Sequence, residues 1–422
     1  MPDEKSKVQP AGPVNPEPGK PARQRIDSID LLRGIVMVIM MLDHTRDFVH
    51  KGGLLFDPTD LTRTTTALFL TRWITHFCAP VFVFLAGAGA YLQFARGKNK
   101  GELSKFLVTR GLWLIVLECT LVKFGAFFTL DYRFLGFLQV IWVIGVSMIT
   151  LAALIYLPLK VTAGFGLIMI ALHNLLDRFQ VQPWQGPQSP VPSVGAKLWM
   201  VLHQQGGFPI FGFPSPFVAI IYPLIPWVGV MAVGYAFGIL YKMEAERRRR
   251  LLLIIGSVIT ALFLLLRLSN LYGDPSKWSR QQSVVFTVLS FLNTTKYPPS
   301  LLFLLMTLGP AIAALAWFEK LRRGWASNIF VTYGRVPLFF YLLQWPTAHL
   351  ISVLLHWVAG KPVKWLFTSP IDLFTNPPPQ NIGFNLAVVY AAWLTGVILL
   401  YPLCKWFAGV KARRRDWWLS YL

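Results

Sequence analysis

The chain has 422 residues, of which 55% are hydrophobic and only 14% are charged, and its formal net charge is +21. This composition excludes a set of soluble domains, because the apolar residues fall in blocks of the ~20 residues that a helix needs to cross a bilayer. The positive charge does not indicate nucleic-acid binding, since the basic residues lie in short segments between apolar blocks and form no recognition module. The sequence therefore predicts an all-α fold, a polytopic membrane helical bundle, with the lipid bilayer as its first partner.

The two ends of the chain differ from the apolar part between them. Residues 1–24 are rich in Pro, Lys and Glu without an apolar stretch, which predicts a disordered cytoplasmic tail and no cleavable signal. Residues 25–410 are expected to form the transmembrane domain, and residues 411–422 a basic cytoplasmic tail. The three cysteines are odd in number and lie in apolar segments, so they are expected to be buried hydrophobes and to form neither a disulfide framework nor a metal site: Cys78, Cys119 and Cys404.

About ten apolar segments are long enough to be membrane-spanning helices. In chain order they cover residues 29–50, 71–94, 106–129, 134–157, 161–177, 216–241, 250–270, 298–319, 328–357 and 383–408. The apolar segment 283–292 is too short to cross and is expected to be interfacial or re-entrant. With a cytoplasmic N-terminus, roughly 26 of the 40 Lys and Arg residues lie on the cytoplasmic side, as the positive-inside rule requires. Both termini are therefore predicted to be cytoplasmic, and the long loops 178–215 and 359–382 to face outward.

The first predicted span carries ionisable side chains, which are energetically costly in a bilayer unless they face protein or a water-filled cavity. At ~100° per residue, five of them fall within a sector of about 140°: Asp30, Arg33, Asp43, His44 and Asp47. Arg46 lies outside this sector. A simpler explanation is that Asp27 and Asp30 cap the start of the helix and that Arg33 pairs with Asp30 one turn on. The helix is expected to border an interior cavity.

Asp43 and His44 lie deep in the first span, where they cannot be explained as a helix cap. A carboxylate beside an imidazole can fix its tautomer and raise its basicity, so a reactive His44 held by Asp43 is expected. A purely structural ion pair and a metal ligand are the alternatives. In the second span, Arg72 and His76 share one face, and the short outward segment between the spans places His76 at the depth of His44.

Further polar groups are expected at the same, outer level of the bundle. Lys296 marks the outer start of span 298–319, although a lysine there could also snorkel to the membrane surface. Gln344 lies in the outer half of span 328–357, where two prolines interrupt the helical pattern. The predicted catalytic residues are His44, Asp43 and His76. The predicted substrate-binding residues are Asp47, Arg72, Lys296 and Gln344.

Several motifs together resemble one known family. They are Asp30-Leu-Leu-Arg-Gly, Leu42-Asp-His-Thr-Arg-Asp, Thr71-Arg-Trp-Ile-Thr-His-Phe-Cys-Ala-Pro, Lys296-Tyr-Pro-Pro-Ser and Gly334-Arg-Val-Pro-Leu-Phe-Phe-Tyr. From about residue 24 to residue 408 the chain looks like the bacterial branch of the heparan-α-glucosaminide N-acetyltransferase-like proteins. The resemblance implies an enzyme of the bacterial inner membrane that carries an acetyl group from cytoplasmic acetyl-CoA to an extracytoplasmic sugar or glycan, with a histidine central to the transfer.

The chain departs from the family pattern at that histidine. In the family it is expected in the outer loop before the second span, but counting back from Pro80 leads to Thr66. His44 or His76 would have to take its place, either as an acetylated intermediate or as a general base. Gln344 also stands where relatives are expected to have histidine.

The resemblance implies acetyl-CoA as the acyl donor, and its phosphates require cations at the inner mouth of the bundle. The candidates are Arg33, Arg96, Lys98 and Arg335, with Arg33 and Arg335 as the predicted cofactor-binding residues. The alternative function for the same buried charges is a proton-coupled transporter of a small solute. A homodimer is compatible with the sequence, which specifies neither the acceptor nor the acyl chain.

Overall fold

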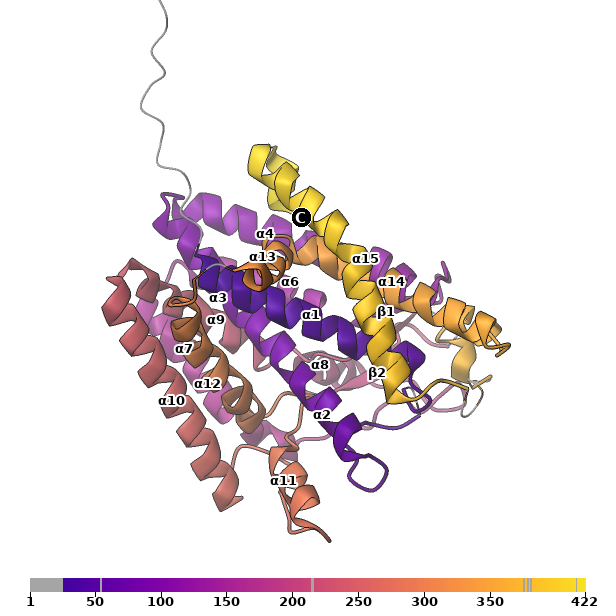
Figure 1. Cartoon of the computed structure of the whole chain (residues 1–422). Helices are drawn as coiled ribbons and strands as arrows, with labels where there is room; N and C mark the ends of the chain where they lie inside the picture. Colours follow the sequence, from indigo (N-terminus) through magenta and orange to yellow (C-terminus); the bar gives the residue numbers. More distant parts are fainter. Residues whose placement is uncertain are drawn as a thin grey trace, which may run out of the picture.

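The computed structural model describes residues 26–422 apart from 54, 214–215, 323, 375, 378, 380–381 and 415. The predicted disordered tail, residues 1–24, lies outside the described residues. Helices dominate the described chain and pack into one bundle (Figure 1). The mainly helical fold predicted from the sequence is therefore confirmed.

Helix α1, Asp27–Val49, lies in the interior of the bundle (Figure 1). Apolar side chains occur all around it and most of its residues are buried. A helix with this pattern is stable when other helices surround it. Its closest approach is to α13, where a Cβ atom on Gly34 would lie 1.7 Å from the carbonyl oxygen of Phe330. The helices that pack most extensively against it are α13 (Trp325–Arg335), α14 (Pro337–Val358) and α15 (Leu386–Arg413).

The second predicted span is broken near its start. A 3-10 turn, Thr75–Phe77, separates α2 (Thr66–Ile74) from α3 (Cys78–Ala95) and carries His76. A π-helical turn, Glu118–Val122, interrupts the third predicted span. The other helices are α4 (Lys100–Leu117), α5 (Lys123–Phe127), α6 (Val140–Leu154), α7 (Leu159–Leu172), α8 (Val194–Leu202), α9 (Trp227–Phe237), α10 (Ala245–Ser269), α11 (Val284–Leu292) and α12 (Leu301–Phe318).

Several helical segments are long and apolar enough to cross a membrane. Among the described residues there are six: Thr66–Ala95, Leu159–Arg178, Ala245–Ser269, Leu301–Phe318, Pro337–Val358 and Leu386–Arg413. Two shorter apolar segments are Val140–Leu154 and Trp227–Lys242. Helix α1 falls outside this set because it carries too many charged residues. The chain is thus a multi-pass membrane protein by length and composition, and the count of about ten spans stays a prediction.

A small sheet corrects the purely helical prediction. It has the order β1-β3-β2, with β1 parallel and β2 antiparallel to β3. Its strands are β1 (Phe134–Leu138), β2 (Gly206–Pro209) and β3 (Phe217–Ile220). β1 and β3 occupy the first residues of the predicted spans 134–157 and 216–241, so the helices there begin later, at Val140 and Trp227. Short apolar runs fit a strand as well as a helix, which is why these starts were misplaced.

The predicted span 328–357 is divided into two helices. Helix α13 ends at Arg335 and α14 begins at Pro337. Proline lacks an N–H and has a fixed φ, so it suits the first turn of a helix better than the interior. The apolar segment at 283–292, expected to be too short to cross, is the nine-residue helix α11.

The bundle has two chemically different ends. The start of α1 and the ends of α3, α13 and α15 contribute basic residues to a single cavity, and we call this the basic end: Arg33, Arg96, Arg335 and Lys411. The opposite end, the loop end, holds the loops that follow α1, α7, α10 and α14. Assignment of the basic end to the cytoplasm stays a prediction from the positive-inside rule.

Candidate functional site

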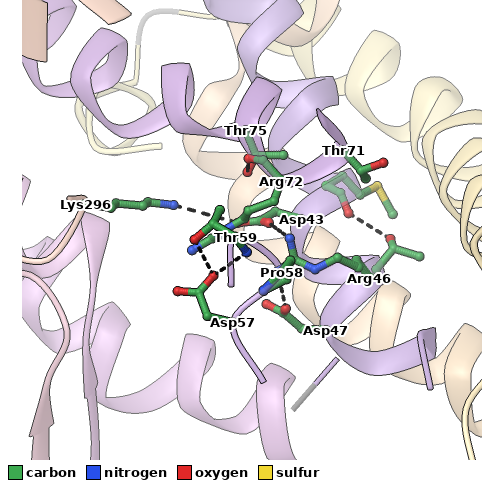
Figure 2. Close-up of polar contacts among 12 residues, drawn as sticks. Asp43, Arg46, Asp47, Asp57, Pro58, Thr59, Thr71, Arg72, Thr75 and Lys296 are labelled. Carbon is green, nitrogen blue, oxygen red and sulfur yellow. Dashed lines mark hydrogen bonds and ion pairs between the residues drawn. The ribbon is translucent and has the colours of Figure 1, made fainter. Parts of the chain in front are cut away.

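Asp43 is the centre of a buried group of charges between α1, α2 and the segment before α12. Its Oδ1 atom lies 2.7 Å from Nη1 of Arg46, and its Oδ2 atom accepts a hydrogen bond from Arg72. Nζ of Lys296 lies 3.9 Å from the same Oδ2. Figure 2 shows Lys296 and Arg46 approaching from opposite sides, with Asp43 and Arg72 between them. We call these four residues and Asp47, which pairs with Arg46 at 2.5 Å, the ion cluster.

The ion cluster carries one positive charge in excess, because three cations face two carboxylates. The side chain of Arg46 is 2% exposed and that of Arg72 is 10% exposed, so these charges are stabilised by their partners and not by bulk water. The structure therefore brings together three predicted substrate-binding residues, Asp47, Arg72 and Lys296, with the predicted catalytic Asp43. Arg46, expected to point away from the polar face, is a central member.

The segment that carries Lys296 is held by a half-buried carboxylate at the loop end, that of Asp274. Asp274 accepts hydrogen bonds from the backbone N–H and hydroxyl of Thr295, both at 2.9 Å, and from the Ser300 hydroxyl at 2.6 Å. Burial raises the pKa of Asp274, although these hydrogen bonds act in the opposite direction. The Asp274 carboxylate thereby holds the backbone on both sides of Lys296, which fixes the position of its ammonium group.

No hydrogen bond joins His44 to Asp43 in the residues that the structure describes, although the Asp43 charge acts on the His44 imidazole. Its ring stacks on Trp345 of α14, with ring centroids 3.8 Å apart, and meets the ring of Tyr341 edge-on at 6.5 Å. Among the described residues, its buried Nδ1 atom has no hydrogen-bond partner. Neighbouring residues on a helix are rotated by ~100°, so Asp43 and His44 address different partners. His44 therefore stacks on an aromatic ring and keeps one imidazole nitrogen without a hydrogen-bond partner in the described part of the chain.

His76 lies beside the ion cluster without joining it by a hydrogen bond. Its ring is tilted against Phe303 with centroids 5.3 Å apart, and its Nδ1 atom is buried without a partner among the described residues. The charges of Lys296, Arg72 and Asp43 all act on this imidazole. No ring contact between His76 and His44 occurs in the described chain, so the two rings lie against different neighbours.

Gln344 is fully buried on α14, next to Trp345 in the sequence. Both atoms of its amide group lack a hydrogen-bond partner among the described residues. No hydrogen bond links Gln344 to the ion cluster in the described structure. Gln344 as a substrate-binding residue therefore stays a prediction, with an unpaired amide as the feature that favours it.

A large cavity opens at the basic end. Its volume is about 1720 Å³, and it is bounded by parts of α1, α3, α4, α6, α13, α14 and α15. All four residues predicted to bind the phosphates of acetyl-CoA line it: Arg33, Arg96, Lys98 and Arg335. Arg33 also pairs with Asp30 at 3.3 Å, which confirms the expected ion pair. The expected cap is wrong, because the N-cap residue of α1 is Ile26, without a side-chain cap hydrogen bond.

The cavity leads inward to Tyr341, which is the aromatic neighbour of His44. On the other side of the ion cluster, Asp47 lines a small hollow of about 20 Å³ together with Phe48 and Trp365. Such a volume holds about one water molecule. His44 and Asp47, less than one turn apart on α1, therefore lie between two openings on opposite ends of the bundle.

Glu118 is a buried carboxylate, and it was not among the site residues predicted from the sequence. It is 1% exposed, lies in the π-helical turn after α4, and accepts the backbone N–H of Trp142 at 3.1 Å. Its charge acts on the Tyr341 hydroxyl at the inner wall of the cavity. A carboxylate inside an apolar span is a signal for function that could have identified it from the sequence.

The fold is that of a multi-pass membrane protein with a polar centre. The chain matches the family described as heparan-alpha-glucosaminide N-acetyltransferase, catalytic, over residues 25–271, which is more than half its length. It belongs to this family of membrane acyltransferases, as the resemblance of its motifs indicated. The matched segment includes Asp43, His44 and His76, whereas Lys296 and α14 follow it. No curated protein matches the chain.

Proposed function

We propose that this protein transfers an acetyl group from cytoplasmic acetyl-CoA, bound in the cavity at the basic end, to a sugar or glycan that arrives at the loop end. The observation that carries this proposal is the cavity of about 1720 Å³, which is lined by cations at the basic end and by Tyr341. The ring of Tyr341 in turn contacts the ring of His44. The proposal places the protein in the bacterial inner membrane with its basic end toward the cytoplasm.

The donor fits the cavity by charge. Its phosphates would bind to the guanidinium and ammonium groups of Arg33, Arg96, Lys98 and Arg335, because arginine forms paired hydrogen bonds with phosphate. The slender pantetheine arm would follow the apolar inner wall, which includes Met37 of α1. The thioester would then lie near Tyr341, within reach of the His44 imidazole.

The chemistry can follow two routes. In the first, His44 takes the proton from the acceptor amine or hydroxyl as it attacks the thioester carbon, and the departing coenzyme A sulfur is protonated. In the second, a nitrogen of His44 attacks the thioester carbon, the C–S bond breaks, and coenzyme A leaves as the thiol with the proton that the imidazole loses. The acceptor amine or hydroxyl then attacks the acetyl group, the bond from the acetyl carbon to His44 breaks, and the acceptor's proton returns to the imidazole. In both routes a negative charge develops on the carbonyl oxygen. The excess positive charge of the ion cluster, with Lys296 its most loosely held cation at 3.9 Å, favours that charge.

The acceptor would come from the loop end. The hollow beside Asp47 has room for about one water molecule and not for a sugar ring, so it marks only the approach to the site; its lining combines a carboxylate with the aromatic side chains of Phe48 and Trp365. Sugar hydroxyls can donate hydrogen bonds to a carboxylate, and the apolar faces of a sugar ring can pack on aromatic rings. This chemistry favours a sugar or envelope glycan over an apolar acceptor.

The test is acetyl transfer by the purified protein from isotopically labelled acetyl-CoA to glucosamine, followed by mass spectrometry. We expect His44→Ala to lower turnover at least ~100-fold, as loss of a general acid–base group does. Stabilisation of the protein by acetyl-CoA against thermal unfolding should persist in this variant, because binding requires the cavity and not His44. The matched control is His356→Ala, a buried histidine of the same bundle with its ring against Phe384.

Unchanged turnover in the His44→Ala variant would remove His44 from the mechanism. Proton-coupled solute uptake into vesicles without dependence on coenzyme A would instead support the transporter. An acetylated His44 in the mass spectrum would select the covalent route.

A further inference from the structure

The chain after α15 folds back across the mouth of the cavity. We call residues 416–421 the C-terminal strap; it contains the 3-10 turn Trp417–Ser420. The side chain of Arg110 donates a hydrogen bond to the carbonyl of Ser420, and the hydroxyls of Thr109 and Tyr421 lie 2.7 Å apart. These contacts attach the C-terminal strap to α4, so it has a defined position in the bundle.

The C-terminal strap forms one wall of the cavity at the basic end. Asp416, Trp417, Leu419 and Ser420 line it, and so do Lys411 and Arg414 just before the strap. The remaining walls include α3, α4 and the loop between them, which contribute further cations and the ring of Phe106. A ligand bound in this cavity therefore has the strap as part of its surroundings.

Trp417 has an arrangement that suits a flat ligand. Its side chain lines the cavity and is 79% exposed, although a large apolar ring normally gains free energy from burial. The ring of Tyr421 meets it edge-on, with centroids 6.0 Å apart, and Tyr421 is itself fixed to Thr109. The indole is thus oriented by the protein while one face stays open.

We propose that the C-terminal strap binds the nucleotide part of the donor, with the adenine stacked on Trp417 and the phosphates paired with Arg414 and Lys411. The inference rests on the proposed function, and it adds the element that distinguishes a coenzyme A thioester from a short thioester. Aromatic side chains bind bases by stacking and basic side chains bind phosphates, and here both occur on one wall of one cavity.

The adjacent tryptophan supplies a matched control. Trp418 is 39% exposed and is absent from the lining of the cavity. Trp417→Ala and Trp418→Ala remove the same side chain from neighbouring positions of the same 3-10 turn. A difference between the two variants therefore reports the position of the ring and not the loss of an indole as such.

The experiment compares two donors, acetyl-CoA and S-acetyl-N-acetylcysteamine, which has the thioester and lacks the nucleotide. We expect Trp417→Ala to raise KM for acetyl-CoA about tenfold, in line with the loss of one base-stacking contact, and to leave kcat nearly unchanged. KM for the short donor should not change in this variant, and Trp418→Ala should change neither KM. An equal rise for both donors, or no rise for acetyl-CoA, would overturn the inference.

Binding of free coenzyme A by calorimetry separates this inference from the proposed function. If the wild-type protein binds coenzyme A without catalysing transfer, the proposed function fails. Weaker binding by Trp417→Ala would still support the strap, and equal binding would overturn it. If the wild-type protein does not bind coenzyme A, both proposals fall together. Equal melting temperatures of the two variants exclude an effect through folding.

Discussion

Replacement of Asp43 by Asn tests the electrostatic account of the ion cluster. Asparagine retains the shape and one acceptor oxygen but removes the negative charge that faces Arg46, Arg72 and Lys296. The excess charge of the cluster rises from one to two, and the two arginine side chains, 2% and 10% exposed, cannot recover this loss from water. Removal of one partner of a buried ion pair destabilises a protein by about 3–5 kcal/mol, and we expect a loss of that size.

The assay is equilibrium unfolding of the purified protein in detergent, with a surface ion pair as the control. Asp372 pairs with Arg133 at 3.0 Å, but their side chains are 42% and 36% exposed. Asp372→Asn should therefore lower the free energy of unfolding by less than about 1 kcal/mol. In the double variant Asp43→Asn, Arg72→Gln the loss should be smaller than the sum of the single losses, because the second change removes an unpaired cation. A loss for Asp43→Asn no larger than for Asp372→Asn would refute the reasoning.

Two further predictions concern other polar groups. Glu118→Ala should lower the free energy of unfolding by about 1–3 kcal/mol, because it leaves the N–H of Trp142 buried without an acceptor. Glu118→Gln keeps an acceptor oxygen, so it should lower the free energy of unfolding by less. Equal losses for the two variants would contradict this. Although burial raises the pKa of Asp131, hydrogen bonds from Arg133 lower it to about 2, against an ordinary value of 3.8. The stability from this contact is therefore complete above pH ~4 and is lost as the pH falls toward 2, so the drop in melting temperature caused by Arg133→Gln should be constant from pH 5 to 8 and shrink below pH 4. A drop that grows with acidity would contradict the assignment.

The sequence located the polar centre of the bundle but not its contacts. Helical phase placed Asp43 and Asp47 on one face of α1, because the 3.6-residue period is a local property. Helical phase placed Arg46 outside this face, because phase describes only the direction of the Cβ atom. The arginine side chain is long enough to reach Asp43 one turn away. Helical phase also paired Asp43 with His44, although adjacent residues of a helix point to different neighbours, and His44 stacks on α14 instead.

The apolar blocks, their lengths and their flanking charges determined by themselves that this is a multi-pass membrane protein, because insertion into a bilayer depends on local hydropathy. Tertiary structure alone decided that β1 pairs with β3 across some eighty residues of chain, and that a cavity forms from seven separate helices. It also decided that the C-terminal residues, expected to be a basic tail, line that cavity. Each of these features is a contact between segments remote in sequence, and the free energy of such contacts depends on the packing of the whole bundle.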